Sequence, residues 1–167
     1  MKHLLSMILL AVVVFQTVNL ATLVHLVVAI PSKPNSLQEV AMKAGLPNPG
    51  EKIMKAVALA SEQTGLSEPF LLALIWSESS FKTCAISSKQ YQGLMQIPKS
   101  SQVFQPLHRE EDINTLIGSK IFVEKLKITH GDYRKALVLY KGWPIDHPEG
   151  KRQADKVLVL ARKLKAN

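Results

Sequence analysis

The sequence predicts an all-α fold in which one helical domain follows an apolar N-terminal segment. Three observations support this prediction. Apolar residues recur at helical spacing after residue 50, no stretch alternates as a strand would, and a length of 167 residues suits a single domain. The composition, 47% apolar and 20% charged, excludes a disordered polar chain. The single cysteine excludes an internal disulfide and any cysteine-based metal cluster.

The apolar N-terminal segment, residues 4–30, contains no acidic residue, Lys or Arg and follows the basic start Met1-Lys2-His3. It exceeds the roughly 20 residues that span a bilayer core, and the roughly 7–15 apolar residues of a signal peptide. No clear cleavage site follows it. Residues 1–31 are therefore expected to be either an uncleaved membrane anchor or a signal peptide. Both place the remaining chain in the cell envelope or periplasm, anchored to the inner membrane or exported.

The segment 32–48 is predicted to be a linker, because prolines, Ser, Asn and Gly recur in and around it. It holds one short possible helix at 37–44. The folded domain is then expected to occupy residues 49–167, which is short but sufficient for a single core.

Five helices are predicted in that domain from apolar spacing and from start signals. The first, 51–63, places Ile53, Ala56, Val57 and Ala60 on one face. The second begins at Ser67-Glu68-Pro69 with a capping hydroxyl, an early acid and an early proline. The others are expected at 113–128, from the cap Asp132 to Tyr140, and at 151–165, which is basic and amphipathic. Residues 82–102 form a long polar loop, and such loops are often functional.

Glu78 is the first candidate for chemistry. Residues 71, 74, 75 and 78 share one face of a helix, so Glu78 ends a stripe that is otherwise apolar. A carboxyl group there faces the core or a cleft, where burial disfavours its charged form. That environment suits a general acid for glycosidic cleavage. The alternative is a structural carboxylate at a frayed helix end, which periodicity alone leaves open.

Two motifs in order favour the catalytic interpretation. Glu78-Ser79-Ser80-Phe81 is followed by the segment Gly-Leu-Met-Gln-Ile-Pro at 93–98. This pair resembles the signature of lytic transglycosylases related to goose-type lysozymes, in which the second motif lines a sugar cleft. Asn114 and Gly118, and the Ala-Leu-Val-Leu-Tyr block at 136–140, match later family motifs. The resemblance covers roughly residues 53–164 and implies a lysozyme-like fold.

One motif departs from the family pattern. The family's Tyr-Asn-Ala-Gly is here Tyr140-Lys141-Gly142-Trp143. Lys141 is expected either to reach an anionic group of the substrate or to point to solvent. Trp143 offers a flat apolar face for a sugar, or else belongs to the core.

The resemblance implies a peptidoglycan lytic transglycosylase that cleaves the MurNAc-GlcNAc β-1,4 bond. Glu78 would act as acid and then as base, and the product would carry a 1,6-anhydro-muramoyl end. No cofactor or metal is expected. The predicted substrate contacts are Ser79, Met95, Gln96, Tyr140, Lys141 and Trp143. The formal net charge of +8 suits an anionic wall polymer and, if the N-terminal segment is uncleaved, a membrane surface.

Several alternatives stay open at this point. The chain could be a hydrolytic lysozyme-like muramidase or a peptidoglycan-binding module with little turnover. A nucleic-acid-binding role for the basic segment 151–165 is not favoured, because a solvated amphipathic face explains its charge more simply. The oligomeric state and the origin of the protein (bacterial, phage or plasmid) are not predicted.

Overall fold

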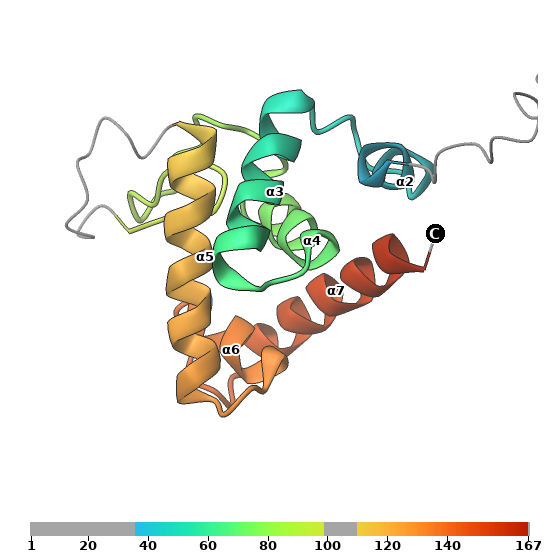
Figure 1. The fold of residues 1–167 in the computed structure, drawn as a ribbon. Coiled ribbons are helices and arrows are strands. Elements are labelled where there is room, and N and C mark those ends of the chain that lie inside the picture. The colour runs from blue at the N-terminus through green and yellow to red at the C-terminus, as the bar shows by residue number, and fades with distance from the viewer. Residues whose placement is uncertain (1–35, 99–109, 167) are drawn as a thin grey trace, which may run out of the picture. The chain divides into compact units, whose positions relative to one another are not determined.

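The structure is a computed structural model that describes residues 36–98 and 110–166. The chain divides into two units, 1–34 and 35–167, and the described residues belong to the second. The predicted signal or anchor at 1–31 lies outside them. The helices are α2 (Leu37–Lys43), α3 (Glu51–Thr64), α4 (Glu68–Ser79), α5 (Glu111–Ile128), α6 (Tyr133–Tyr140) and α7 (Pro148–Lys165) (Figure 1).

The all-helical prediction is confirmed for this part of the chain. Isolated bridges pair Gln92 with Ile86 and with Ile97, and no longer strand forms among the described residues. No helix within these ranges is long and apolar enough to cross a membrane.

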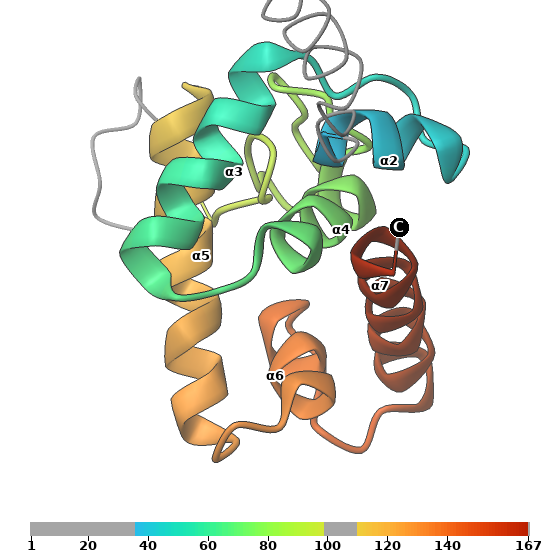
Figure 2. The same ribbon diagram turned by 45° about the vertical axis from the view of Figure 1, so that its right-hand side comes forward.

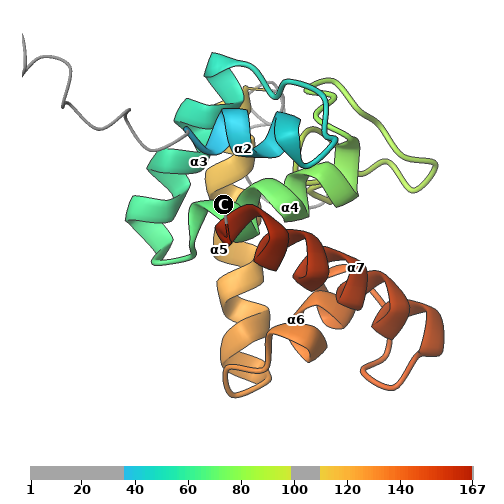
Figure 3. The same cartoon turned by 90° about the vertical axis from the view of Figure 1, so that its right-hand side faces the viewer.

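Helix α4 is the centre of the domain. It packs against α3 and α7, α3 packs along α5, and α6 contacts both α5 and α7 (Figures 2 and 3). The apolar residues of α4 face all of its neighbouring helices, as expected for a helix that is hydrophobic on every side. The buried residues of α4 are Phe70, Leu71, Leu72, Ala73, Leu74, Ile75 and Ser79. The core therefore fixes the position of the α4 backbone that carries the polar residues at its C-terminal end.

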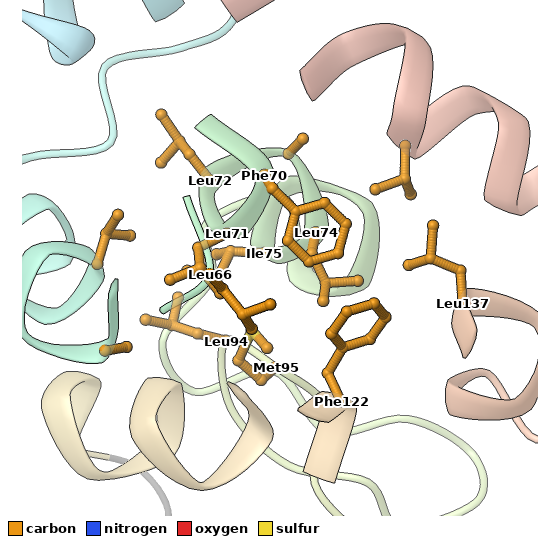
Figure 4. Packing of buried hydrophobic residues seen from close by; sticks show 14 of the residues in the cluster. Leu66, Phe70, Leu71, Leu72, Leu74, Ile75, Leu94, Met95, Phe122 and Leu137 are labelled. Atoms are coloured by element: carbon orange, nitrogen blue, oxygen red, sulfur yellow. The ribbon is translucent and has the colours of Figure 1, made fainter. Parts of the chain in front are cut away.

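An aromatic cluster joins α4 to α5 and α6. The rings of Phe70 and Phe122 lie 4.8 Å apart between centroids, and Tyr133 meets Phe70 edge-on at 5.0 Å. Figure 4 shows Phe70 and Phe122 facing each other beside Leu74 and Leu137. This packing fixes the separation of the three helices that carry the site described below.

Most helix ends follow the predicted signals. Asp132 caps α6 by accepting a hydrogen bond from the Lys135 amide at 3.0 Å, as expected. Ser67 occupies the N-cap position of α4 but makes no side-chain capping bond. Helix α7 begins at Pro148, three residues before the predicted start, because His147 Nδ1 accepts from the Gly150 amide and proline suits the first turn.

The segment expected to be a linker contains α2. Val40 and Ala41 are buried in the core, and α2 packs against α7. Lys163 Nζ on α7 donates to the Ala44 carbonyl at 3.0 Å. The folded domain therefore begins at α2 rather than near Pro49, because a short amphipathic helix between prolines covers the C-terminal part of α7.

Candidate active site

The end of α4 places Glu78. Ser80 and Phe81 follow it with φ of 52° and 65°, a left-handed turn that ends the helix, and the Ser80 amide bonds to the Trp76 carbonyl at 2.9 Å. The rings of Trp76 and Phe81 lie 5.1 Å apart and brace this turn. The Glu78 side chain is 13% exposed and lines a cavity of about 270 Å³.

The cavity gathers polar groups from α4, from the loop before α5, and from the region of α6 and α7. Its lining residues are Ser77, Glu78, Ser87, Ser88, Lys89, Tyr91, Gln96, Tyr140, Lys141, Trp143 and Gln153. Glu78 is the one carboxylate in this described lining. A second cavity of about 220 Å³ shares Tyr91, Gln96 and Tyr140 with the first, so the hollow continues toward α5.

Lys141 contacts Glu78 directly. Its Nζ lies 2.5 Å from Glu78 Oε1 and donates to Ser77 Oγ at 3.0 Å, and its side chain is 8% exposed. From the sequence, the Lys141 side chain was expected to reach a substrate anion or to point to solvent. In the structure it points to the candidate acid instead.

Tyr140 supports the opposite wall. Its hydroxyl donates to the Met95 carbonyl at 2.7 Å, and its ring meets Phe122 at 6.0 Å. Burial, together with the negative charge of Glu78, raises the pKa of Tyr140 well above its usual value. The residue therefore stays a neutral phenol and a hydrogen-bond donor across the physiological range.

The loop that carries the second motif is pinned to α5. Asn114 Oδ1 accepts from the Met95 amide at 2.8 Å, and its Nδ2 donates to the Gln92 carbonyl at 3.0 Å. Gly118 lets the loop approach, because a Cβ there would lie 2.4 Å from Met95 Cβ. These contacts give a physical reason for the Asn and Gly spacing noted in the sequence.

Gln96 and Trp143 complete the polar and aromatic parts of the lining. Gln96 has a φ of 49°, and its Nε2 donates to the carbonyls of Gly93 and Ala85 at 2.9 and 3.3 Å. Trp143 stacks on His147 with centroids 4.0 Å apart and planes at 19°. The tryptophan thus belongs to the cavity wall, and the histidine supports one face of its ring.

The structure brings together most of the predicted site residues. Those that line the cavity are Glu78, Gln96, Tyr140, Lys141 and Trp143. Ser79 and Met95 lie outside this lining. Ser79 donates its hydroxyl to the Ile75 carbonyl at 3.2 Å, and Met95 is fully buried. Met95 takes part through its backbone, which bonds to Asn114 and Tyr140.

Sequence reasoning missed several lining residues. Ser77 precedes the candidate acid and bonds to Lys141, while Lys89 and Tyr91 come from the polar loop and Gln153 comes from α7. Tyr91 lies in the polar loop 82–102, whose length was a usable signal. Gln153 had none, because only the packing of α7 brings it to the cavity. Within the described ranges, no group of three His, Cys, Asp or Glu side chains is placed to hold a metal ion.

Comparisons with known proteins concern the domain as a whole. The sequence profile of the Transglycosylase SLT domain matches residues 55–156. Among solved structures, an inactive mutant of the lytic transglycosylase Slt from Pseudomonas aeruginosa is similar at 18% identity with a TM-score of 0.60. The similar region covers 67% of this chain and 24% of that one, and it shows a shared fold. A search of curated proteins found no match. Because the profile matches more than half of its residues, the chain belongs to the transglycosylase SLT domain family.

Proposed function

We propose that the protein is a peptidoglycan lytic transglycosylase that cleaves the MurNAc-GlcNAc β-1,4 bond with Glu78 as its catalytic residue. The observation that carries this proposal is a single, mostly buried carboxylate in a polar cavity of a transglycosylase-family domain. A buried acid with no second carboxylate beside it suits a reaction in which the substrate supplies its own nucleophile.

The proposed reaction has two proton transfers. Protonated Glu78 gives its proton to the bridging oxygen as the bond from that oxygen to the muramoyl C1 breaks. The resulting carboxylate then takes the proton of the muramoyl 6-hydroxyl as its oxygen bonds to C1. The product is a 1,6-anhydro-muramoyl end, Glu78 regains its proton, and no water is consumed.

A conventional glycosidase mechanism is the main alternative. It needs a second carboxylate at roughly 5–9.5 Å from the first, to act as nucleophile or to activate water. The described lining offers lysine, tyrosine, serine and glutamine beside Glu78, and these groups do not replace that carboxylate. The lining therefore favours the transglycosylase. The tests below distinguish it from a hydrolytic muramidase and from a wall-binding module.

The remaining parts of the proposal concern substrate contacts and location. We propose that Gln96, Tyr140 and Trp143 contact the glycan from the cavity wall. The net charge of +8 favours approach to a polymer that bears carboxylates. We also propose that the apolar residues 4–30 export the domain or anchor it at the membrane, which would bring it to the peptidoglycan.

The direct test compares the full chain with its Glu78→Gln variant on purified peptidoglycan. Loss of a general acid is expected to lower the rate of muropeptide release by about 10²–10⁴-fold. Sedimentation with insoluble peptidoglycan should be unchanged, because glutamine preserves the shape of the side chain. Equal rates of muropeptide release by the two proteins would reject Glu78 as the catalytic residue. A folded wild type that binds peptidoglycan without releasing products would identify a binding module.

A further inference from the structure

Lys141 has a fixed backbone position at the end of α6. It is the C-cap of that helix, with φ of −76° and ψ of 4°, and its amide donates to the Leu137 carbonyl at 3.1 Å. The next residue, Gly142, has a φ of 77° and turns the chain away toward Trp143. The lysine side chain therefore starts from an anchored point rather than from a free loop.

From this point the side chain reaches across to α4, where it has two partners. Nζ contacts Glu78 Oε1 at 2.5 Å and Ser77 Oγ at 3.0 Å, although these residues are 63 and 64 positions away in the chain. Both members of the ion pair are mostly buried. A buried charged contact of this kind restricts the carboxyl group to one orientation and resists competition from water.

The other charged or titratable groups that face this carboxyl in the described cavity are few. Tyr140 lies beside it on α6 and remains neutral, while Lys89 and Tyr91 line the loop side. No second acidic side chain accompanies Glu78 in this described lining, and Lys141 is the cation in direct contact with it. The local electrostatic balance of the acid therefore depends chiefly on Lys141.

The family pattern has asparagine at this position. An asparagine side chain ends at its δ atoms, two atoms before the position of the lysine Nζ, so from the same backbone it would stop short of Glu78 Oε1. It also brings no charge. The lysine thus makes a contact that the usual family residue cannot make.

We infer that Lys141 is a positioning residue for Glu78, which holds the carboxyl group in one orientation in the cleft. This inference rests on the proposed function. The ammonium group stabilises the carboxylate that remains after proton donation, and its contact keeps the carboxyl group aligned. Loss of the lysine should therefore lower kcat much more than it changes KM.

The test uses the full chain with Lys141→Met, Lys141→Asn and Lys141→Arg. The matched control is Lys127→Met, which also removes a cation from a Lys–Glu pair, with Glu124 at 2.8 Å, but on the exposed surface. The measurements are kcat and the apparent KM for muropeptide release, with thermal unfolding to verify folding.

In Lys141→Met and Lys141→Asn, kcat should fall by roughly 10–100-fold with little change in the apparent KM, since a displaced catalytic group loses its alignment. Lys141→Arg should recover most of the wild-type kcat, and Lys127→Met should match the wild type. A Lys141→Asn enzyme with the wild-type kcat would overturn the inference. If Lys141→Met does not fold, the Arg and Asn variants decide.

A second measurement separates this inference from the proposed function. If the wild type releases no product at any pH, the function fails, but the ion pair can still be tested by stability. Lys141→Met should lower the melting temperature of the wild type more than that of the Glu78→Gln variant, because the pair is already lost in the latter. Equal losses in both backgrounds would show that Lys141 does not act through Glu78.

Discussion

Two ion pairs tie opposite ends of α6 to neighbouring helices, and they differ in almost everything except length. At the C-terminal end, Lys141 meets Glu78 on α4 at 2.5 Å, with side chains 8% and 13% exposed. At the N-terminal end, Arg134 meets Asp155 on α7 at 2.6 Å, with side chains 44% and 49% exposed. The first lies in the candidate active site and the second lies in solvent.

The larger of the two cavities beside these ion pairs is not the candidate active site, although a large cavity is the usual first choice for one. The exposed pair borders a groove of about 720 Å³ along α6 and α7, far larger than the cavity at Glu78. Two further cations of this groove, Lys151 and Arg152, pair with neighbouring acids on the surface. Exposed pairs of this kind have little energetic consequence. Burial and convergence of polar groups, rather than volume, distinguish the site that can perform chemistry.

Substituting Asn114 should give the largest loss of stability on the cleft side. Asn114→Ala removes two of the bonds that hold the loop and leaves the Met95 amide and the Gln92 carbonyl buried without this partner. The expected cost is about 2–4 kcal/mol of unfolding free energy, measured by denaturant unfolding. Asn48→Ala is the control, because that exposed residue also makes two side-chain hydrogen bonds, which it accepts from the Gly50 amide and from Gln38 Nε2. Equal losses would remove the distinction between the buried site and the surface.

Substituting Gly118 tests the close approach of loop and helix. Gly118→Ala places a methyl group 2.4 Å from Met95 Cβ, so the loop must shift away from α5. Overpacking of this kind costs about 1–3 kcal/mol, and the shift should also lower activity. Gly150→Ala, whose nearest atoms would lie at 3.0 Å, is expected to cost less in the same unfolding experiment. The reverse order would contradict the packing described at Met95.

Substituting Tyr140 tests the support for the second motif. Tyr140→Phe keeps the ring against Phe122 but removes the donor to the Met95 carbonyl. Leaving that carbonyl without this donor is expected to cost about 1–3 kcal/mol, near the lower end because one bond is lost. Tyr133→Phe, on the exposed side of α6, is the comparison in thermal unfolding. A larger loss from Tyr133→Phe would show that the hydroxyl of Tyr140 is not structural.

The smallest effect is expected from the exposed ion pair and should depend on pH. Hydrogen bonding to Arg134 lowers the pKa of Asp155 below its unfolded value of about 3.8, so the folded state favours the carboxylate. The contribution to stability is therefore present above that value and is lost as the pH falls through the lower folded value. The melting temperatures of wild type and Asp155→Asn should differ slightly near neutral pH and converge in acid. A difference that persists in acid would show another role for Asp155.

Sequence patterns identified the cavity residues where local geometry decides their position. The 3.6-residue period placed Glu78 on the buried stripe of α4. The motif at 93–98 pointed to Gln96, and the segment 136–143 pointed to Tyr140 and Trp143. The direction of Ser79 was not predictable in the same way, because its hydroxyl can bond either to substrate or to its own helix. The structure shows the bond to its own helix.

Contacts between distant segments could not be read from the sequence. The partner of Lys141 depends on how α6 meets α4, and the burial of Val40 depends on how α2 covers α7. The short α2 segment lies between prolines, and its few apolar residues gave too weak a pattern to distinguish a docked helix from a linker. Tertiary packing decided both.

The most direct test of the central claim is the fate of water in the reaction. Purified peptidoglycan is digested by the full chain in ¹⁸O-labelled water, and the new muramoyl ends are examined by mass spectrometry. The single-carboxylate site predicts 1,6-anhydro products that are lighter than the hydrolysis products by one water and contain no ¹⁸O. Products with reducing ends that carry the label would contradict the account, because they would require a second group that activates water.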